Sequence, residues 1–126
     1  NNDDRWYICF SMIPISYAGA GVTGYHIPTI KEWCDAHTII NGALNCSFTS
    51  NWQPDTLVKT ILKIPFAGVR HNSNASYPYQ GSYGCYWSSS QVNSTNAYHV
   101  DINSSQTSPN YSSVKAFAFS IRCTKN

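Results

Sequence analysis

Tyr86-Trp87-Ser88-Ser89-Ser90 is the stretch that decides the fold, together with the hydrophobic residues 116–123 near the end of the chain. An aromatic pair beside small hydroxyl side chains is typical of a strand that fixes the segments next to it. We interpret Trp87 as a core anchor and residues 88–90 as hydrogen-bonding ties to neighbouring backbone. Three serines without a base do not form a nucleophile. The stretch therefore predicts a supporting frame that holds the loop before it and the loop after it.

The composition indicates one packed domain. The chain has 126 residues, of which 11% are charged and 14% are aromatic. So many aromatic residues argue against disorder, and the polarity comes mainly from Ser, Asn, Thr and Gln. The net charge of +2 is small and scattered, which argues against a nucleic-acid partner. No stretch approaches the ~20 apolar residues of a membrane span, so we expect no direct membrane insertion. We expect residues 1–126 to be a single domain, excised from or C-terminal in a longer surface protein.

The cysteines and histidines predict no metal site and no cofactor. The chain has five cysteines, which are Cys9, Cys34, Cys46, Cys85 and Cys123. None of them forms a C-x-x-C pair, and the histidines show no zinc spacing. An odd number leaves at least one thiol unpaired in a monomer. Two alternatives stay open, namely one or two disulfides, with Cys85–Cys123 as one guess, and buried free thiols that act as small hydrophobic side chains.

The clearest local signal is a helix start. Thr29-Ile30-Lys31-Glu32 is a capping box, in which the Thr29 hydroxyl accepts from the Glu32 N–H and the Glu32 carboxylate reaches back. Ile30, Trp33, Cys34 and His37 follow at the spacing of one helix face. The sequence therefore predicts a short helix near residues 29–38 with an apolar face. We expect His26 and His37 to pack in the core.

The remaining pattern is one of strands and polar loops. Apolar and aromatic residues predict strands at 6–10, 85–89, 97–102 and 116–123, the last of them central because both of its faces are apolar. Residues 55–64 fit either a helical turn capped by Asp55 or a strand. Polar residues 71–84 and 103–113 predict a long loop and a hairpin loop. The sequence thus predicts an α+β fold with antiparallel strands and long polar loops.

Several motifs follow one another in a fixed order. They are Gly24-Tyr25-His26-Ile27-Pro28-Thr29, Glu32-Trp33, Pro65-Phe66-Ala67-Gly68-Val69-Arg70, Gly84-Cys85-Tyr86-Trp87-Ser88-Ser89-Ser90 and Ser120-Ile121-Arg122-Cys123. In this order the chain resembles the Fibrobacter succinogenes major paralogous domain family of bacterial, largely surface or secreted, proteins. That family resembles C-type-lectin-like folds, distantly including formylglycine-generating enzymes and the variable proteins of diversity-generating retroelements. The resemblance implies a domain that displays loops on a rigid frame at a bacterial cell surface, in the secreted fraction or on a phage virion. It carries over no catalytic residues.

The loop residues predict a binding surface. Tyrosine offers rigid contact area, while Ser and Asn supply adaptable hydrogen bonds. Such a composition fits loops diversified by a retroelement, which changes adenines in Asn codons, and it fits ordinary polar loops as well. We expect the ligand, a protein or a glycan on another cell or surface, to contact Asn72, Asn74, Tyr77, Tyr79, Tyr83, Asn93, Asn96, His99, Asp101, Asn103, Asn110 and Tyr111.

Other readings stay open beside this one. Gln53-Pro54-Asp55, preceded by Trp52, matches a calcium-site tripeptide of galactose-type C-type lectins, and it also fits a proline-anchored turn. His99 and Asp101 share one strand face, where they either meet a ligand together or face solvent. No hydrolase motif is present, so we expect no enzyme activity. The alternative to a recognition domain is a structural or tip module of a bacterial surface or pilus assembly.

Overall fold

The computed structural model describes residues 6–7, 25–41, 52–56 and 58–125. Helix α1 (Ile30–Asn41) confirms the predicted helix and extends it, and α2 (Val58–Ile61) is a single helical turn within the ambiguous residues 55–64. Strand β1 (Trp6–Tyr7) lies in the predicted first strand, and residues 8–10 lie outside the described residues. Neither described helix is long and apolar enough to cross a bilayer. The α+β fold class is confirmed.

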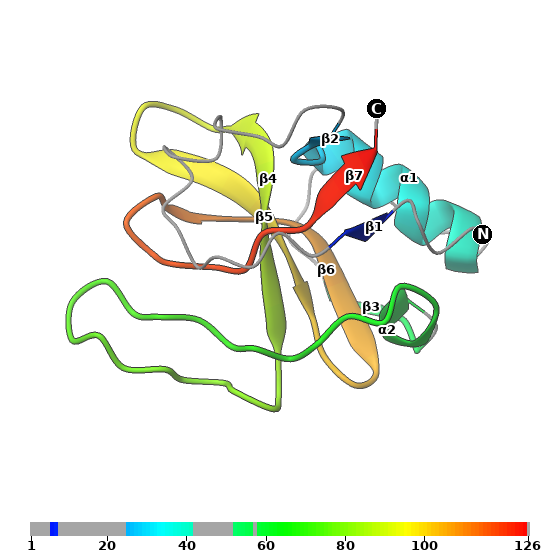
Figure 1. Ribbon diagram of the computed structural model, residues 1–126, viewed down its shortest axis with the longest axis horizontal. Helices are drawn as coiled ribbons and strands as arrows, with labels where there is room; N and C mark the ends of the chain where they lie inside the picture. Colours follow the sequence, from blue (N-terminus) through cyan, green and yellow to red (C-terminus); the bar gives the residue numbers. More distant parts are fainter. Residues whose placement is uncertain (1–5, 8–24, 42–51, 57, 126) are drawn as a thin grey trace.

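Two antiparallel sheets organise the described part of the chain (Figure 1). The larger sheet has the order β3-β6-β5-β4 and consists of β3 (Gln53–Pro54), β4 (Gly84–Gln91), β5 (Asn96–Ile102) and β6 (Gln106–Val114). The smaller sheet places β7 (Cys123–Lys125) between β1 and β2 (Tyr25–His26). The connection between α2 and β4 projects beyond the larger sheet as a long two-armed loop. We call residues 62–83 the long connection.

The larger sheet has an apolar cluster on each face, because side chains alternate along its strands. On one face Tyr86, Val100 and Ile102 pack against Trp33 of α1, with the Trp33 and Tyr86 ring centroids 5.9 Å apart. On the other face Trp87 is fully buried and stacks on Phe119 at 4.4 Å. Trp87 is therefore the core anchor that its sequence context predicted.

Two predicted elements are wrong. Residues 103–113 are not a hairpin loop, since β6 begins at Gln106 and pairs with β5 and β3, which leaves only 103–105 as the turn. Residues 116–123 are not one continuous strand. Ala116 and Phe117 belong to the turn that follows β6, and the residues after them make only isolated bridges at Ala118 and Ser120 before β7 begins. The Trp87 N–H donates to the Ser120 carbonyl at 3.1 Å, so this segment is held by a few backbone bonds and by its buried rings.

The three serines that follow Trp87 form a bulge in β4. The register with β5 shifts between Trp87 and Gln91, which releases Ser88, Ser89 and Ser90 from regular pairing. The Ser88 hydroxyl donates to the Tyr98 carbonyl at 2.8 Å, and the Ser89 N–H donates to the Pro28 carbonyl at 2.9 Å. The predicted role as backbone ties is confirmed for the hydroxyls of Ser88 and Ser90, whereas Ser89 is tied through its own N–H.

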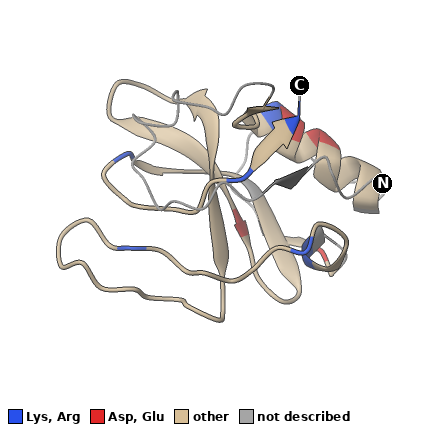
Figure 2. Cartoon of the chain, in the orientation of Figure 1, with Lys and Arg blue, Asp and Glu red and all other residues tan. Residues whose placement is uncertain are grey.

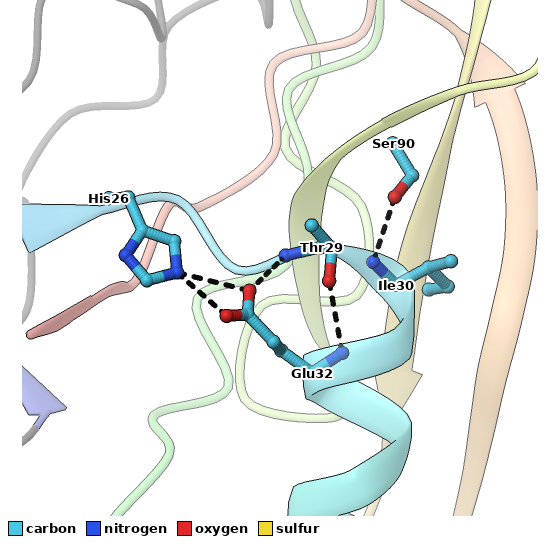
Figure 3. A network of polar contacts seen from close by, with 5 residues as sticks. All are labelled: His26, Thr29, Ile30, Glu32 and Ser90. Carbon is cyan, nitrogen blue, oxygen red and sulfur yellow. Dashed lines mark hydrogen bonds and ion pairs between the residues drawn. The ribbon is translucent and has the colours of Figure 1, made fainter. Parts of the chain in front are cut away.

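The capping box at the start of α1 is also confirmed (Figure 3). The Glu32 N–H donates to the Thr29 hydroxyl at 3.1 Å, and the Thr29 N–H donates to the Glu32 carboxylate at 2.8 Å. The Ile30 N–H, one of the unpaired donors of the first turn, donates to the Ser90 hydroxyl at 3.0 Å. Two distant segments of sequence therefore satisfy one helix terminus.

The two histidines near α1 differ in burial. His37 is fully buried, as predicted, and its Nδ1 lies 3.0 Å from an oxygen of Asp55, which is itself buried. His26 does not pack in the core. It lies on the edge strand β2, its side chain is 38% exposed, and its Nε2 lies 2.9 Å from the Glu32 carboxylate. The prediction for His26 was wrong because its side chain turns from the edge strand to the Glu32 carboxylate, while the next two residues, Ile27 and Pro28, are the ones that enter the core.

Candidate functional site

A cavity of about 410 Å³ lies on the face of the larger sheet that is turned away from α1. Its floor comes from β4, β5 and β6, and its walls come from the long connection, from the segment before β7 and from the residue that precedes β3. We call it the aromatic pocket. It is lined by Trp52, Val69, His71, Tyr79, Tyr83, Cys85, His99, Asp101, Tyr111, Ser113, Phe117 and Phe119.

Edge-to-face ring contacts hold the pocket walls. Tyr83 lies 5.7 Å from Trp52 and 5.3 Å from Tyr79, measured between ring centroids, and both pairs are steeply inclined. His71 meets Phe117 in the same way at 5.0 Å. Such arrangements place the positive edge of one ring against the negative face of another. The rings are therefore positioned by one another, although they come from separate parts of the chain.

The long connection folds back on itself where it forms the pocket wall. The Val69 N–H donates to the Pro78 carbonyl at 3.2 Å, and the Gly68 N–H donates to the Tyr83 carbonyl at 2.9 Å. Tyr79 has a φ of 67°, a left-handed conformation that is strained for a bulky residue. Strained residues persist where the surrounding structure holds them firmly, and they concentrate at ligand clamps and active sites. Tyr79 is also 58% exposed, so its ring is accessible to a ligand.

A line of hydrogen bonds crosses the pocket floor. His99 Nδ1 lies 2.9 Å from Asp101 Oδ1, and His99 Nε2 lies 2.9 Å from the Ser113 hydroxyl. His99 is 2% exposed, packed against Trp87, Tyr111 and other rings. The reading of His99 as part of a solvent-facing pair is therefore wrong, because the rings cover it. Asp101 and His99 lie on the same strand face, as the alternation predicted.

Cys85 completes the floor beside Asp101, its partner in the β4–β5 register. Burial, reinforced by the nearby Asp101 carboxylate, raises the pKa of the Cys85 thiol far above its ordinary value, so the thiol stays protonated. The thiol is free, whereas Cys34 and Cys123 are disulfide-bonded. The suggested Cys85–Cys123 pair is therefore wrong. A buried protonated thiol contributes packing rather than reactivity.

Asp101 is the one charged residue in the four strands of the larger sheet, and charged residues are sparse elsewhere (Figure 2). Among the described residues that line the pocket, none is Lys or Arg. Within the described ranges no group of three His, Cys, Asp or Glu side chains is placed to hold a metal ion. Asp55 of the suggested calcium tripeptide points inward to His37, so it offers no oxygen to a calcium ion at the surface.

The comparison with protein families bears on the same region. A family model described as a domain of unknown function (DUF8237) matches residues 44–124, well over half of the chain. The chain belongs to this family. The matched residues include every residue of the aromatic pocket, so the pocket lies within the DUF8237 domain. No curated protein and no solved structure matches the chain.

The DUF8237 domain brings together some of the residues predicted to bind a ligand. Tyr79, Tyr83, His99, Asp101 and Tyr111 all line the aromatic pocket. The other predicted residues lie elsewhere. Asn72, Asn74 and Tyr77 lie on the exposed part of the long connection, Asn93 lies at the β4–β5 turn, Asn96 begins β5, Asn103 lies at the β5–β6 turn, and Asn110 is buried in β6.

Three of the asparagines outside the pocket stabilise turns through their side chains. Asn74, Asn93 and Asn103 accept hydrogen bonds from the N–H groups two residues further on, at 2.9 to 3.0 Å. These bonds are typical of Asx turns. The β4–β5 and β5–β6 turns also lie at opposite ends of β5, as consecutive hairpins require. The predicted ligand contacts at these two turns, Asn93 and Asn103, therefore do not lie on one continuous surface.

Sequence reasoning missed part of the pocket. Trp52, His71, Ser113, Phe117 and Phe119 line it but were not among the predicted ligand contacts. The alternation of Phe117 and Phe119 was visible and was assigned to a central strand. A ring that packs in a core and a ring that lines a pocket leave the same pattern in a sequence.

Proposed function

We propose that this DUF8237 domain is a non-catalytic recognition domain that binds its ligand in the aromatic pocket. The observation that carries the proposal is the meeting of Tyr79, Tyr83 and Tyr111 from two separate segments around the one carboxylate of the larger sheet. The cavity of about 410 Å³ falls within the roughly 300–1,000 Å³ of known ligand pockets. Aromatic walls with a few convergent polar groups are the usual composition of such sites.

The finer features of the proposal rest on the family resemblance. We propose a C-type-lectin-like domain of a bacterial surface or secreted protein, or of a phage virion, whose loops a retroelement diversifies. The disulfide bonds at Cys34 and Cys123 are consistent with an oxidising compartment. Sequencing the gene in several isolates tests the diversification. Substitutions at adenine-encoded codons of residues 72–111, beside a reverse transcriptase gene, would support it, and invariant loops would contradict it.

A binding experiment tests the pocket itself. The purified chain is labelled and applied to a glycan array and to bacterial cell surfaces, alongside a Tyr79→Leu/Tyr111→Leu double variant. Tyr77→Leu is the matched control, because Tyr77 is an equally exposed tyrosine of the same loop but lies outside the cavity. We expect the double variant to lose binding and the control to keep it. If the folded double variant binds as strongly as the original protein, the ligand does not bind in the aromatic pocket. That result would favour the structural or tip module.

A catalytic function deserves a direct test because of one observation. Asp101, His99 and Ser113 have the order of bonds found in a serine nucleophile with its base and orienting acid. His99 is covered by rings, however, and a base must exchange its proton with a bound substrate. We therefore assign this line of bonds to the rigidity of the pocket floor. Covalent labelling of Ser113 by a fluorophosphonate, abolished in a His99→Ala variant, would overturn the non-catalytic assignment.

A further inference from the structure

The aromatic pocket carries an inference about the chemistry of its ligand, and this inference rests on the proposed function. We infer that the pocket binds a trimethylammonium group, whether it belongs to a trimethylated lysine side chain or to a choline headgroup. Two properties of the pocket lead to this inference, namely its charge and its ring content.

The charge of the pocket selects against anions. Asp101 is the one carboxylate among the described lining residues, and no Lys or Arg accompanies it. Its side chain is only 15% exposed, so its charge acts in surroundings that solvent screens weakly. A carboxylate has about four acceptor positions, and the bonds from His99 and from the neighbouring Cys85 thiol leave others open. An anionic ligand would be repelled, whereas a cation would find a counter-charge on the pocket floor.

The rings supply the second attraction. Aromatic faces attract cations within about 6 Å of the ring centroid, most strongly when the cation is desolvated. Trp52, Tyr79, Tyr83, Tyr111 and Phe117 surround the cavity from different elements of the fold. Rings on several sides of a cavity with a carboxylate at its base are the arrangement that recognises quaternary ammonium groups.

The histidines of the pocket are hydrogen-bonded within the protein. His99 bonds to Asp101 and Ser113, and His71 Nδ1 accepts from the Ser73 N–H, so these three ring nitrogens already have partners. A trimethylammonium group has no N–H or O–H to satisfy. Its charge is spread over methyl groups that pack on rings.

Calorimetric titration of the whole chain tests the inference. The probes are choline, its neutral carbon isostere 3,3-dimethylbutan-1-ol, and a trimethyllysine peptide beside its unmethylated form. We expect choline to bind at least about tenfold more tightly than the isostere, because the two differ in charge and hardly in shape. Preference for the trimethyllysine peptide would identify a protein as the source, and preference for choline would identify a headgroup.

Two variants and a control test whether choline binds in the aromatic pocket. Asp101→Asn keeps an acceptor for His99 and removes the charge, so we expect it to weaken choline binding about tenfold and leave isostere binding unchanged. Tyr111→Leu should weaken both probes, while Tyr77→Leu should weaken neither. Circular dichroism confirms that each variant is folded.

The outcomes separate the inference from the proposed function. Equal affinity for choline and its isostere, or no binding of either ammonium probe, would overturn the ammonium inference. In that event a glycan or protein ligand that depends on Tyr79 and Tyr111 would leave the proposed function intact. If choline binding persists in both Asp101→Asn and Tyr111→Leu, choline does not bind in the aromatic pocket. That result would overturn the inference and would give no support to the pocket as a ligand site.

Discussion

Replacing Gly68 with Ala tests how firmly the long connection holds the pocket wall. Gly68 has a φ of 70°, and a Cβ placed on it would lie 2.6 Å from the Pro78 carbonyl oxygen and 2.7 Å from the Gln80 nitrogen. Ordinary van der Waals contact begins at 3.4 Å, so the first of these contacts is about 0.8 Å too short. Both neighbours are backbone atoms and cannot rotate away. The loop itself must move.

Gly81→Ala is a matched control from the same loop. Gly81 has a φ of 80°, and nothing lies within 4 Å of the position of its Cβ. Each substitution therefore carries the cost of a left-handed alanine, roughly 1–2 kcal/mol. The lower chain entropy of the unfolded alanine variant offsets about 0.4–1 kcal/mol of it. Only Gly68→Ala adds a steric cost. Overpacking costs about 1–3 kcal/mol, and we expect the upper end of this range because the clashing atoms belong to the backbone.

Urea unfolding followed by tryptophan fluorescence measures the difference. We expect Gly81→Ala to lower the free energy of unfolding by about 1 kcal/mol and Gly68→Ala to lower it by about 2–3 kcal/mol more. Gly68→Ala should also weaken ligand binding, because Gly68 and Val69 fasten the segment that carries Tyr79 and Tyr83. If the two variants differ by less than about 0.5 kcal/mol, the spread of ordinary surface substitutions, the close packing of the loop is refuted.

Three further predictions concern the helix cap and the cysteines. Thr29→Ala removes a cap acceptor and should lower the free energy of unfolding by about 1 kcal/mol in urea titrations. Partial burial alone would raise the pKa of Glu32, but the hydrogen bond from the Thr29 N–H, the hydrogen bond and charge of His26 and the Thr29 side chain together outweigh it and hold the pKa below its ordinary value of 4.5. The stability that this carboxylate contributes is therefore present above pH 4.5 and lost as the pH falls through the lower folded pKa, and Glu32→Gln should flatten the acid limb of the stability curve. Reduction should lower the free energy of unfolding by about 2–5 kcal/mol through the disulfides at Cys34 and Cys123, and Cys85→Ala should leave that response unchanged.

The helix was predictable because its signals are local. Thr29 and Glu32 are three residues apart, and the buried positions that follow repeat every three or four residues. The serines after Trp87 were interpreted correctly for a similar reason, since hydroxyls beside a buried strand have few partners other than backbone. Strand β6 was not predictable from such signals. Its residues are mostly polar, and backbone pairing with β5 makes it a strand whatever its side chains prefer.

The candidate site was also predictable only in part. The tyrosines were recognised one by one as suitable contacts, because ring area and a hydroxyl belong to each residue. Their meeting in one cavity depends on topology, since Tyr79 and Tyr111 are far apart in the chain and β6 had been read as a loop. Asn93 and Asn103 looked like equally suitable contacts, but each side chain bonds to its own turn. Composition alone cannot distinguish an asparagine that holds a turn from one that meets a ligand.

The bond between the Ile30 N–H and the Ser90 hydroxyl has a consequence for the order of folding. It joins residues 60 positions apart, so it forms only after β4 has docked, whereas the capping box of the same helix closes within a few residues. Ser90→Ala should therefore speed unfolding and leave the folding rate nearly unchanged, while Thr29→Ala should slow folding. The helix can begin early, and the sheet fastens its first turn late.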